Sequence, residues 1–495
     1  IFTEGVFTEE KEDIWGTMKR GIIATLLIVL LVPGAAQGGP PTLVWQKTYG
    51  GSNYDTGTNV IRTGDGGYLI VGHTKSSSSG EQDIFVVKTD GWGNKEWEKR
   101  LGGEYWDWGY AALQTVDGGF VIVGATFTAT KQEDALLIKL TQNGVVEWEK
   151  KFGGDLWDIA FSLIQTSDGG YAIVGYTGSY GENKGDVWLI KTDRFGDEEW
   201  SKTYPGSERD AGYSIIQTAD GGYAVAGFTS SKGNGGKDAW LLKINAWGNV
   251  EWDKTYGGAQ DDVARHIIQT ADNGYLLVGW TSSFGSGSYD VWIAKIASSG
   301  NLEWQKSFGG PDVDQGYQAM KTEDGGYIIT GFTRSFGSGA EDAWLLKIDS
   351  KGNEEWNRTF GGPLRDEGYS LVVLDNACVV AGLTFSFGAG SGDMWIFKAG
   401  PQESIPSSEE ETGSVFPLIE VIYLGVGVGV VGGTSAAIMM HKRKSGRKVG
   451  EIGERLMKLK KSPLAEAVEE LKRKKEGKKT SPLTEAMEKL KKKRG

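Results

Sequence analysis

Cysteine and histidine are scarce in this chain of 495 residues, which contains one Cys and three His. The single thiol, Cys378, excludes an internal disulfide and any metal site built from cysteines. His73, His266 and His441 share no metal-ligand spacing with each other. The signatures GxSxG, Walker A, HExxH and the EF-hand loop are missing as well. The motifs therefore predict neither a bound cofactor nor a common type of catalytic centre.

Positive charge is scarce over most of the chain. The net charge is −12, yet residues 441–495 hold 20 Lys and Arg against 8 Asp and Glu. The remaining 440 residues therefore carry a net charge of −24. An acidic surface repels phosphate backbones, so we expect no nucleic-acid partner.

A long repeat is abundant instead. The phrase QTSDGGYAIVGYT (165–177), the Asp of DVWLIK (186–191) and the Trp of GNVEWDKTYGG (248–258) each recur every 51 or 52 residues, in seven copies. A fixed period of this length is typical of propellers and other repeat architectures. The three series are Gly72, Gly124, Gly175, Gly227, Gly279, Gly331, Gly382; Asp83, Asp134, Asp186, Asp238, Asp290, Asp342, Asp393; and Trp45, Trp97, Trp148, Trp200, Trp252, Trp304, Trp356.

Each copy contains four short segments rich in Val, Ile, Tyr, Trp and Thr, as strands prefer. Four strands repeated seven times predict an all-β, seven-bladed β-propeller of four-stranded blades over residues 41–400. The last copy lacks its fourth strand, and a matching segment stands alone at 43–51, so we expect this N-terminal strand to close the ring. Asp168-Gly169 predicts a two-residue hairpin turn with positive φ at both residues.

The phrases DGGY…G.T, D.WL.K and G…W.K.YGG resemble the extracellular β-propeller repeats of bacterial and archaeal surface proteins. The resemblance covers residues 41–400 and implies a fold rather than a function. KIDSKGNEEW (347–356) is also similar to the tryptophan-docking motif of quinoprotein-like propellers. That resemblance implies that the tryptophans from Trp45 to Trp356 pack between blades.

The segments that flank the repeats predict a membrane-anchored surface protein. A basic start, a short apolar run and small residues near Ala35 are typical of a signal peptide, with a retained N-terminal anchor as the alternative. A later apolar stretch is long enough to span a bilayer, and the basic residues after it place that end in the cytoplasm. In order, the segments are an upstream extension at 1–17, a signal peptide at 18–37, an acidic linker at 401–414, a single-pass transmembrane helix at 415–440 and a basic cytoplasmic tail at 441–495.

Small residues recur every fourth position in this span, at Gly425, Gly429, Gly433 and Ala437. They form one smooth helix face that suits a homodimer, although glycine is also simply common in membrane helices. The tail holds two helical SPLxEA repeats, at 462–475 and 481–494. We expect it either to lie near anionic lipid or to bind a cytoplasmic partner.

An aspartate recurs before each first strand, where the loops of a propeller crowd the mouth of its central channel. A ring of seven such carboxylates would suit Ca²⁺. The alternative is that each Asp holds its own loop by accepting backbone N–H bonds. The seven residues are Asp55, Asp107, Asp158, Asp210, Asp262, Asp314 and Asp366.

Two of these loops, GGEYWDWGY (102–110) and GGDLWDIAF (153–161), carry aromatic residues that most other copies lack. An aromatic surface beside carboxylates suits a sugar ring, whereas loop packing or a protein contact is the alternative. Turns on the opposite face hold Trp92, Phe195 and Trp247, and Arg209, Arg265, His266 and Arg365 are unmatched charged or titratable residues scattered over several blades. The predicted ligand-binding residues are Glu104, Tyr105, Trp106, Asp107, Trp108, Asp155 and Trp157.

Three hypotheses follow for the function. The leading one is a non-enzymatic surface module that binds a glycan, a cell-wall polymer or a protein. The second is a propeller enzyme, such as a quinoprotein-like dehydrogenase or a glycan-active enzyme, which needs an acid–base pair or a cofactor at the channel mouth. The third is a structural component of the cell envelope.

Overall fold

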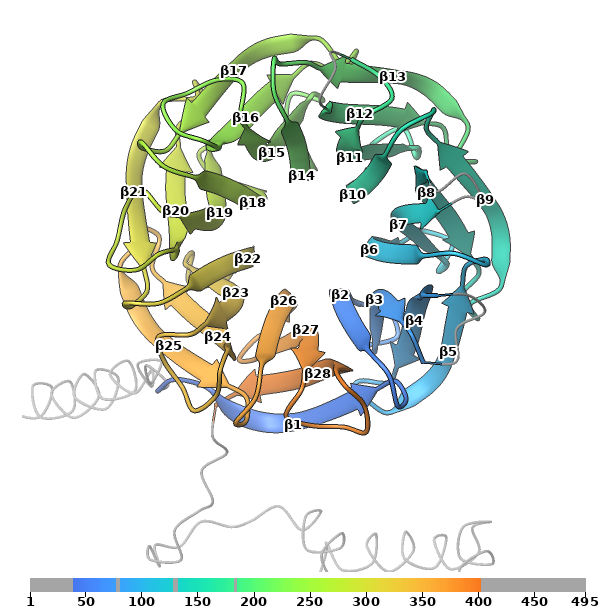
Figure 1. Ribbon diagram of the computed structural model, residues 1–495, viewed down its shortest axis with the longest axis vertical. Helices are drawn as coiled ribbons and strands as arrows, with labels where there is room; N and C mark the ends of the chain where they lie inside the picture. Colours follow the sequence, from blue (N-terminus) through green and yellow to red (C-terminus); the bar gives the residue numbers. More distant parts are fainter. Residues whose placement is uncertain (1–38, 77–80, 128–131, 182–184, 402–495) are drawn as a thin grey trace, which may run out of the picture. The chain divides into compact units, whose positions relative to one another are not determined.

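The computed structural model describes residues 39–76, 81–127, 132–181 and 185–401, and every regular element in these ranges is a β-strand. The strands form seven antiparallel four-stranded sheets, arranged as blades around a central axis (Figure 1). The predicted all-β, seven-bladed propeller is confirmed.

The blades follow chain order, and in each of them the first strand is innermost (Figure 1). Blades 1 to 4 are β2 (Asp55–Arg62), β3 (Tyr68–Thr74), β4 (Asp83–Thr89), β5 (Lys95–Leu101); β6 (Asp107–Gln114), β7 (Phe120–Phe127), β8 (Glu133–Leu140), β9 (Val146–Phe152); β10 (Asp158–Gln165), β11 (Tyr171–Thr177), β12 (Asp186–Thr192), β13 (Glu198–Tyr204); and β14 (Asp210–Gln217), β15 (Tyr223–Thr229), β16 (Asp238–Ile244), β17 (Val250–Tyr256). Blades 5 to 7 are β18 (Asp262–Gln269), β19 (Tyr275–Thr281), β20 (Asp290–Ile296), β21 (Leu302–Phe308); β22 (Asp314–Lys321), β23 (Tyr327–Thr333), β24 (Asp342–Ile348), β25 (Glu354–Phe360); and β26 (Asp366–Val373), β27 (Cys378–Thr384), β28 (Asp393–Gly400), β1 (Thr42–Tyr49).

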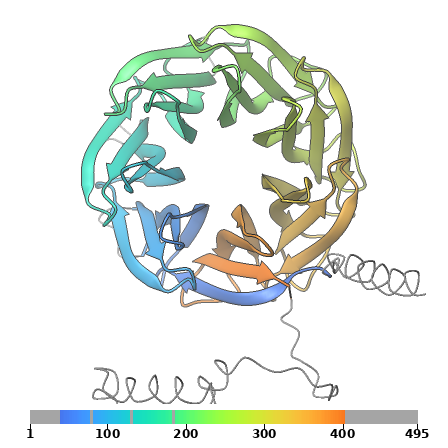
Figure 2. The same cartoon turned by 180° about the vertical axis from the view of Figure 1, so that it is seen from behind.

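The ring closes through the N-terminal strand, as predicted. β1 runs antiparallel to β28, with Thr42 opposite Gly400 and Tyr49 opposite Met394. Seen from behind, β1 is the blue outer strand beside the orange strands of blade 7 (Figure 2). Joining the two ends of the repeat in one sheet leaves no open gap between the first and last blades.

The predicted signal peptide, transmembrane helix, tail and small-residue face (Gly425, Gly429, Gly433, Ala437) lie outside the described residues, as does nearly all of the linker. Within the described ranges, no helix has the length and apolar character needed to cross a membrane. The predictions for these segments stay predictions.

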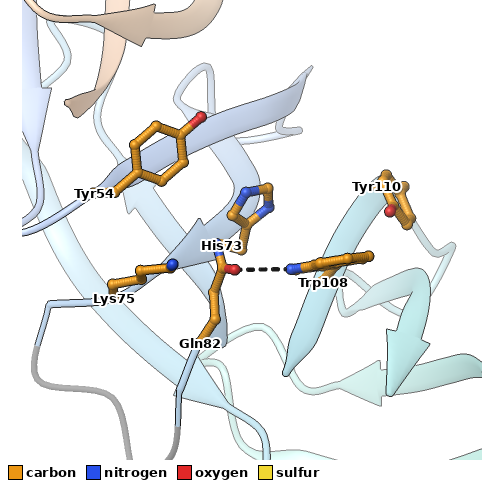
Figure 3. Close-up of a pocket in the computed structure, with 6 residues that line it drawn as sticks. All are labelled: Tyr54, His73, Lys75, Gln82, Trp108 and Tyr110. Atoms are coloured by element: carbon orange, nitrogen blue, oxygen red, sulfur yellow. Dashed lines mark hydrogen bonds between the residues drawn. The ribbon is translucent and has the colours of Figure 1, made fainter. Parts of the chain in front are cut away.

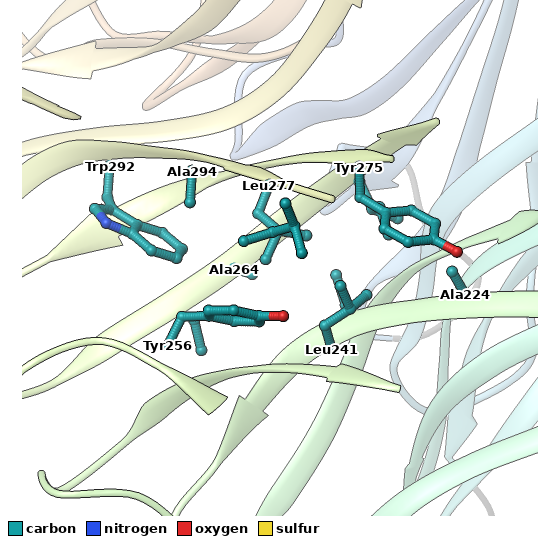
Figure 4. Close-up of a cluster of buried hydrophobic side chains, with 12 residues drawn as sticks. Ala224, Leu241, Tyr256, Ala264, Tyr275, Leu277, Trp292 and Ala294 are labelled. Carbon is teal, nitrogen blue, oxygen red and sulfur yellow. The ribbon is translucent and has the colours of Figure 1, made fainter. Parts of the chain in front are cut away.

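The hydrophobic core lies between blades. One cluster joins Leu241 and Tyr256 of blade 4 to Tyr275 and Trp292 of blade 5 (Figure 4). On the outer strand β17, the Trp252 ring meets Tyr275 of the next blade at 6.1 Å. Equivalent contacts join Trp45 to Tyr68, Trp97 to Phe120, Trp148 to Tyr171 and Trp200 to Tyr223, so the predicted packing of these tryptophans between blades is confirmed.

The Asp-Gly hairpins differ from the prediction. Thr166 N donates to Gly170 O and Gly169 N donates to Thr166 O, which makes a three-residue loop in which Gly169 alone has a positive φ, of 88°. Asp168 instead accepts hydrogen bonds from Thr166 and from Gly170 N. It also pairs with the buried Lys191 at 2.9 Å, and this ion pair recurs in blades 1 to 6. The carboxylate is therefore used for tertiary contact rather than for a left-handed backbone.

Each innermost strand contains a β-bulge. In blade 4, Gly212 pairs with Gly227 and Ser214 with Ala226, which leaves Tyr213 without a partner on β15. A Cβ on Gly227 would lie 1.9 Å from Ala211 O, so the close approach of the two strands explains why the repeat keeps glycine there. The bulge breaks the pairing of one residue per blade along the channel.

Candidate functional site

The aspartate ring lies at the first residue of each innermost strand, and all seven side chains are at most 2 % exposed. Asp158 accepts hydrogen bonds from Gly154 N at 2.9 Å, Ser179 Oγ at 2.6 Å and Thr177 Oγ1 at 2.5 Å. These are the bonds that a local role in the loop requires. In the described ranges, no three His, Cys, Asp or Glu side chains gather as a metal site. Binding of Ca²⁺ stays a prediction.

The predicted aromatic surface is only partly brought together. Trp106 and Trp108 stack with their centroids 6.1 Å apart and their planes at 18°, and Phe127 meets both rings edge-on. Trp106 is 38 % exposed. No ring contact joins Tyr105 or Trp157 to this stack within the described part of the chain, although Trp157 is 56 % exposed on the next loop.

The carboxylates among the predicted binding residues differ in their exposure to solvent. Glu104 and Asp155 are exposed. Asp107 is 2 % exposed and accepts a hydrogen bond from Gly103 N at 2.8 Å, so it supports the loop and does not face a ligand. Its inclusion among the binding residues was wrong, because sequence position alone does not show that the carboxylate turns inward.

A pocket of about 400 Å³ opens beside the tryptophan stack. Its lining comes from blades 1 and 2 and the loops that lead into them, and His73 lies between Tyr54 and Trp108 (Figure 3). The Trp108 indole N–H donates to Gln82 Oε1 at 2.9 Å. The lining residues are Tyr54, His73, Lys75, Gln82, Trp108 and Tyr110.

His73 gives this pocket a neutral polar group. Its ring stacks on Tyr54 with centroids 6.1 Å apart, and its Nδ1 is buried without a hydrogen-bond partner in the described structure. Burial, with a smaller contribution from Lys75, lowers the pKa of His73 to about 4, so the imidazole is uncharged at neutral pH. A buried polar atom without a partner is a place where water or a ligand binds.

The bulged residues form a further feature, the channel ring, which sequence reasoning missed. We define it as Thr58, Tyr110, Phe161, Tyr213, Arg265, Tyr317 and Tyr369. Tyr110 meets Phe161 at 5.2 Å, Phe161 meets Tyr213 at 5.1 Å, and Tyr317 meets Tyr369 at 5.1 Å. The open centre drawn by the ribbons in Figure 1 is therefore narrowed by large side chains. The sequence signal that could have revealed the channel ring is the position three residues after each ring aspartate, where the residue type differs from blade to blade.

Blades 6 and 7 place two buried glutamates near the same mouth. Arg334 Nε donates to Glu341 Oε1 at 2.7 Å, and Arg365 Nε lies 2.5 Å from Glu341 Oε2. Arg365 also pairs with Glu367, which is 1 % exposed. Burial, assisted by Glu341, raises the pKa of Glu367. This cluster joins Arg365, which the sequence marked as unusual, to two carboxylates on neighbouring blades.

The other singled-out residues remain apart. Trp92, Phe195 and Trp247 lie in turns at the opposite end of the outer strands and are 69 %, 54 % and 74 % exposed. The Arg209 guanidinium lies over Tyr176 at 5.0 Å. His266 is half-buried, and desolvation of its ring lowers its pKa to about 4. Cys378 is 1 % exposed within the core.

Comparison with known proteins identifies no family. No protein-family model matches the chain. Regulatory protein FlaEY of Caulobacter vibrioides is 27 % identical over 165 residues, and the match covers 28 % of this chain and only 17 % of that protein. Among solved structures, the WD40 propeller domain of Doa1 has a TM-score of 0.45 at 12 % identity, over 74 % of this chain and 98 % of that one. The WD40 domain of Neurospora crassa Pan2 has a TM-score of 0.47 at 12 % identity, over 75 % and 99 %.

Proposed function

We propose that the propeller is a binding module that takes a sugar-containing ligand at the channel mouth over blades 1 and 2. One observation carries the proposal: the exposed Trp106, stacked on Trp108, borders a pocket of about 400 Å³ into which the fold brings the unpartnered His73 Nδ1. No other blade repeats this arrangement of two tryptophans in sequence.

The chemistry of the pocket fits a sugar better than a purely apolar or a strongly charged ligand. A flat indole covers the apolar C–H face of a sugar ring, whereas a few convergent polar groups select its hydroxyls. The His73 Nδ1 accepts, the Lys75 ammonium donates, and the Gln82 amide does both. Trp106 and Trp108 hold each other in place and share Phe127 as backing, so the ligand orders few side chains on binding.

The test is a glycan array probed with the purified full chain, with and without Ca²⁺. We expect retention of at least one glycan class and a loss of about tenfold or more in affinity in Trp106→Ala, which corresponds to about 1.4 kcal/mol. Trp247→Ala is the matched control, because Trp247 is exposed at the opposite end of its blade. Absence of any retained glycan, or an equal loss in both variants, contradicts the proposal and leaves a protein-docking surface.

We also propose that this module is displayed on the cell surface by a single membrane span, with its tail in the cytoplasm. The supporting observations are the uncharged stretch at 421–440 and the basic residues that follow it. Protease added to intact cells should remove the propeller and leave residues 441–495 protected. A propeller that survives until the cells are opened contradicts this orientation.

An enzyme that acts at the mouth is the second candidate, and the Glu341–Glu367 pair favours it. A carboxyl of raised pKa beside an ionised one is a common acid–base arrangement. Both carboxyls are used by Arg334 and Arg365, however, and are at most 5 % exposed. Turnover of an array glycan that disappears in Glu367→Gln supports this candidate, whereas intact glycans after prolonged incubation contradict it.

A further inference from the structure

We propose that the channel ring contains a second binding site, for an oxyanion, built on Arg265. The site takes the carboxylate, sulfate or phosphate group of a ligand that enters the channel. It is independent of the sugar pocket, although Tyr110 belongs to both the pocket and the ring.

Arg265 is the one cation among the seven ring residues, which otherwise are Thr, Phe and Tyr. Its guanidinium lies 4.3 Å from the centroid of the Tyr213 ring and 5.8 Å from that of Tyr317. Aromatic rings from both neighbouring blades therefore lie close to the guanidinium. Aromatic faces attract a cation but accept few of its N–H bonds.

The charge of Arg265 is not neutralised by the fold. Within the described ranges, no carboxylate pairs with Arg265 and no acceptor bonds to it, and its Nε is buried without a partner. The other arginines near the mouth differ, because Arg334 and Arg365 are both held by glutamates. Arg265 is half-buried, and a cation that is partly desolvated without an anion is costly, so structures normally provide one.

The geometry supports an anion rather than a structural role alone. The bulge places residue 265 on the strand that lines the channel, between residues that pair with Gly279 and Val278. Contact with Tyr213 and Tyr317 restricts the guanidinium in advance, and its planar fork suits two parallel bonds to one oxyanion. The Thr58 hydroxyl donates to Gly109 O at 2.7 Å. Because its side chain is short, blade 1 is the position at which the channel ring is least filled.

The test is calorimetric titration of the full chain with glucuronate, inorganic phosphate, sulfate and neutral glucose at constant ionic strength. We expect at least one anion to bind and its affinity to fall about 10- to 100-fold in Arg265→Gln, as loss of charged hydrogen bonds predicts. Arg209→Gln should leave the affinity unchanged, because Arg209 stacks on Tyr176 but lies exposed on the rim. The three anions separate a carboxylate from a phosphate or sulfate ligand.

Thermal unfolding without anions supplies the folding control. Arg265→Gln should be as stable as the wild type or more stable, because it removes an unpaired, half-buried charge. If that variant does not fold, Arg265→Lys keeps the charge but loses the planar fork, and should weaken binding by about severalfold. Failure of all three anions to bind, or equal affinity in the wild type and both Arg265 variants, overturns the proposal. Phosphate and sulfate are not sugars. Their binding therefore tests the Arg265 site separately from the sugar pocket.

Discussion

The outer strands and the channel ring of this propeller follow opposite rules. On and beside the outer strands the same contacts recur from blade to blade. A tryptophan of the outer strand packs on the next blade, and a buried lysine of the third strand lies between one carboxylate of the outer strand and one of the first hairpin. In the channel ring, equivalent positions hold Thr58, Phe161, Arg265 and four tyrosines. Both regions are built on the same backbone, so the fold does not require the differences in the ring.

This contrast separates stability from function. A contact that recurs at every blade junction serves the junction, and its loss should cost the same in any blade. A residue type that occurs in only one blade is not explained by packing alone, because the other blades pack without it. The Trp106–Trp108 stack and Arg265 both belong to this second kind. The predictions below test whether the two kinds of position behave differently.

The largest effect is expected from Trp252→Ala on the outer strand. The change removes the contact with Tyr275 and opens space above Gly300, so we expect a loss of about 3 kcal/mol in unfolding free energy. Urea unfolding measures it, with Trp148→Ala as the equivalent change in blade 2. Similar losses in both variants support the repeated role, whereas a difference of several kcal/mol contradicts it. Trp247→Ala, at an exposed turn, should change stability by less than about 0.5 kcal/mol.

A smaller effect is expected from Asp158→Ala. The change leaves Gly154 N and the hydroxyls of Thr177 and Ser179 without their acceptor, which should cost about 2 kcal/mol. Thermal unfolding of Asp158→Ala and Asp262→Ala in the same buffer measures the loss. Added Ca²⁺ should raise the melting temperature of neither variant nor of the wild type. A calcium-dependent rise in the melting temperature of the wild type that disappears in these variants would show that the aspartate ring binds the cation.

The smallest effects are expected from pH, and two carboxylates, Asp168 in a hairpin of blade 3 and Glu133 at the start of β8 in blade 2, should respond in opposite directions. Partial burial raises the pKa of Asp168, but bonds from Thr166, Lys191 and Gly170 outweigh it and lower the pKa to about 2. Its stabilisation is present above 3.8 and is lost as the pH falls toward 2. Burial raises the pKa of Glu133 from 4.5 to about 7, so its contribution is present below 4.5 and is lost as the pH rises to 7.

Urea unfolding across this pH range measures both responses. Asp168→Asn should cost less than about 1 kcal/mol at pH 7, because the Asp168 side chain is largely solvated, and the difference should vanish near pH 2. Glu133→Gln should gain about 1 kcal/mol over the wild type at pH 8 and none at pH 4. Parallel pH profiles of the unfolding free energy for both variants contradict the opposite effects expected from Asp168 and Glu133.

The sequence predicted the fold well because its period exposes every structural constraint seven times. The strands and ring closure by residues 42–49 follow from spacing and composition, whereas the inter-blade tryptophans were predicted from the resemblance to tryptophan-docking repeats. The Asp168 turn was predicted wrongly because an Asp-Gly pair suits both a two-residue and a three-residue hairpin. Only the contact with Lys191, which is distant in sequence, shows what the carboxylate does.

The candidate site was only partly predictable. Trp106 and Trp108 stood out because other copies lack them, but whether Tyr105 and Trp157 join them depends on loop geometry. The channel ring was missed because its members are ordinary strand residues until the bulge turns them out of the pairing. Arg265 was noticed as unusual, but its position between Tyr213 and Tyr317 required the blades to be placed.

The most direct test of the account is an NMR titration of the tryptophan indole N–H groups of the full chain, assigned by single Trp→Phe changes. Addition of the glycan that the array retains should shift the signal of Trp106 and that of Trp108, the residue whose indole N–H donates to Gln82 in the pocket. The signals of Trp92 and Trp247, at the opposite face, should not move. Shifts at Trp92 and Trp247, or no shift at the two mouth tryptophans, would contradict the claim that the unrepeated residues of the mouth form the binding site.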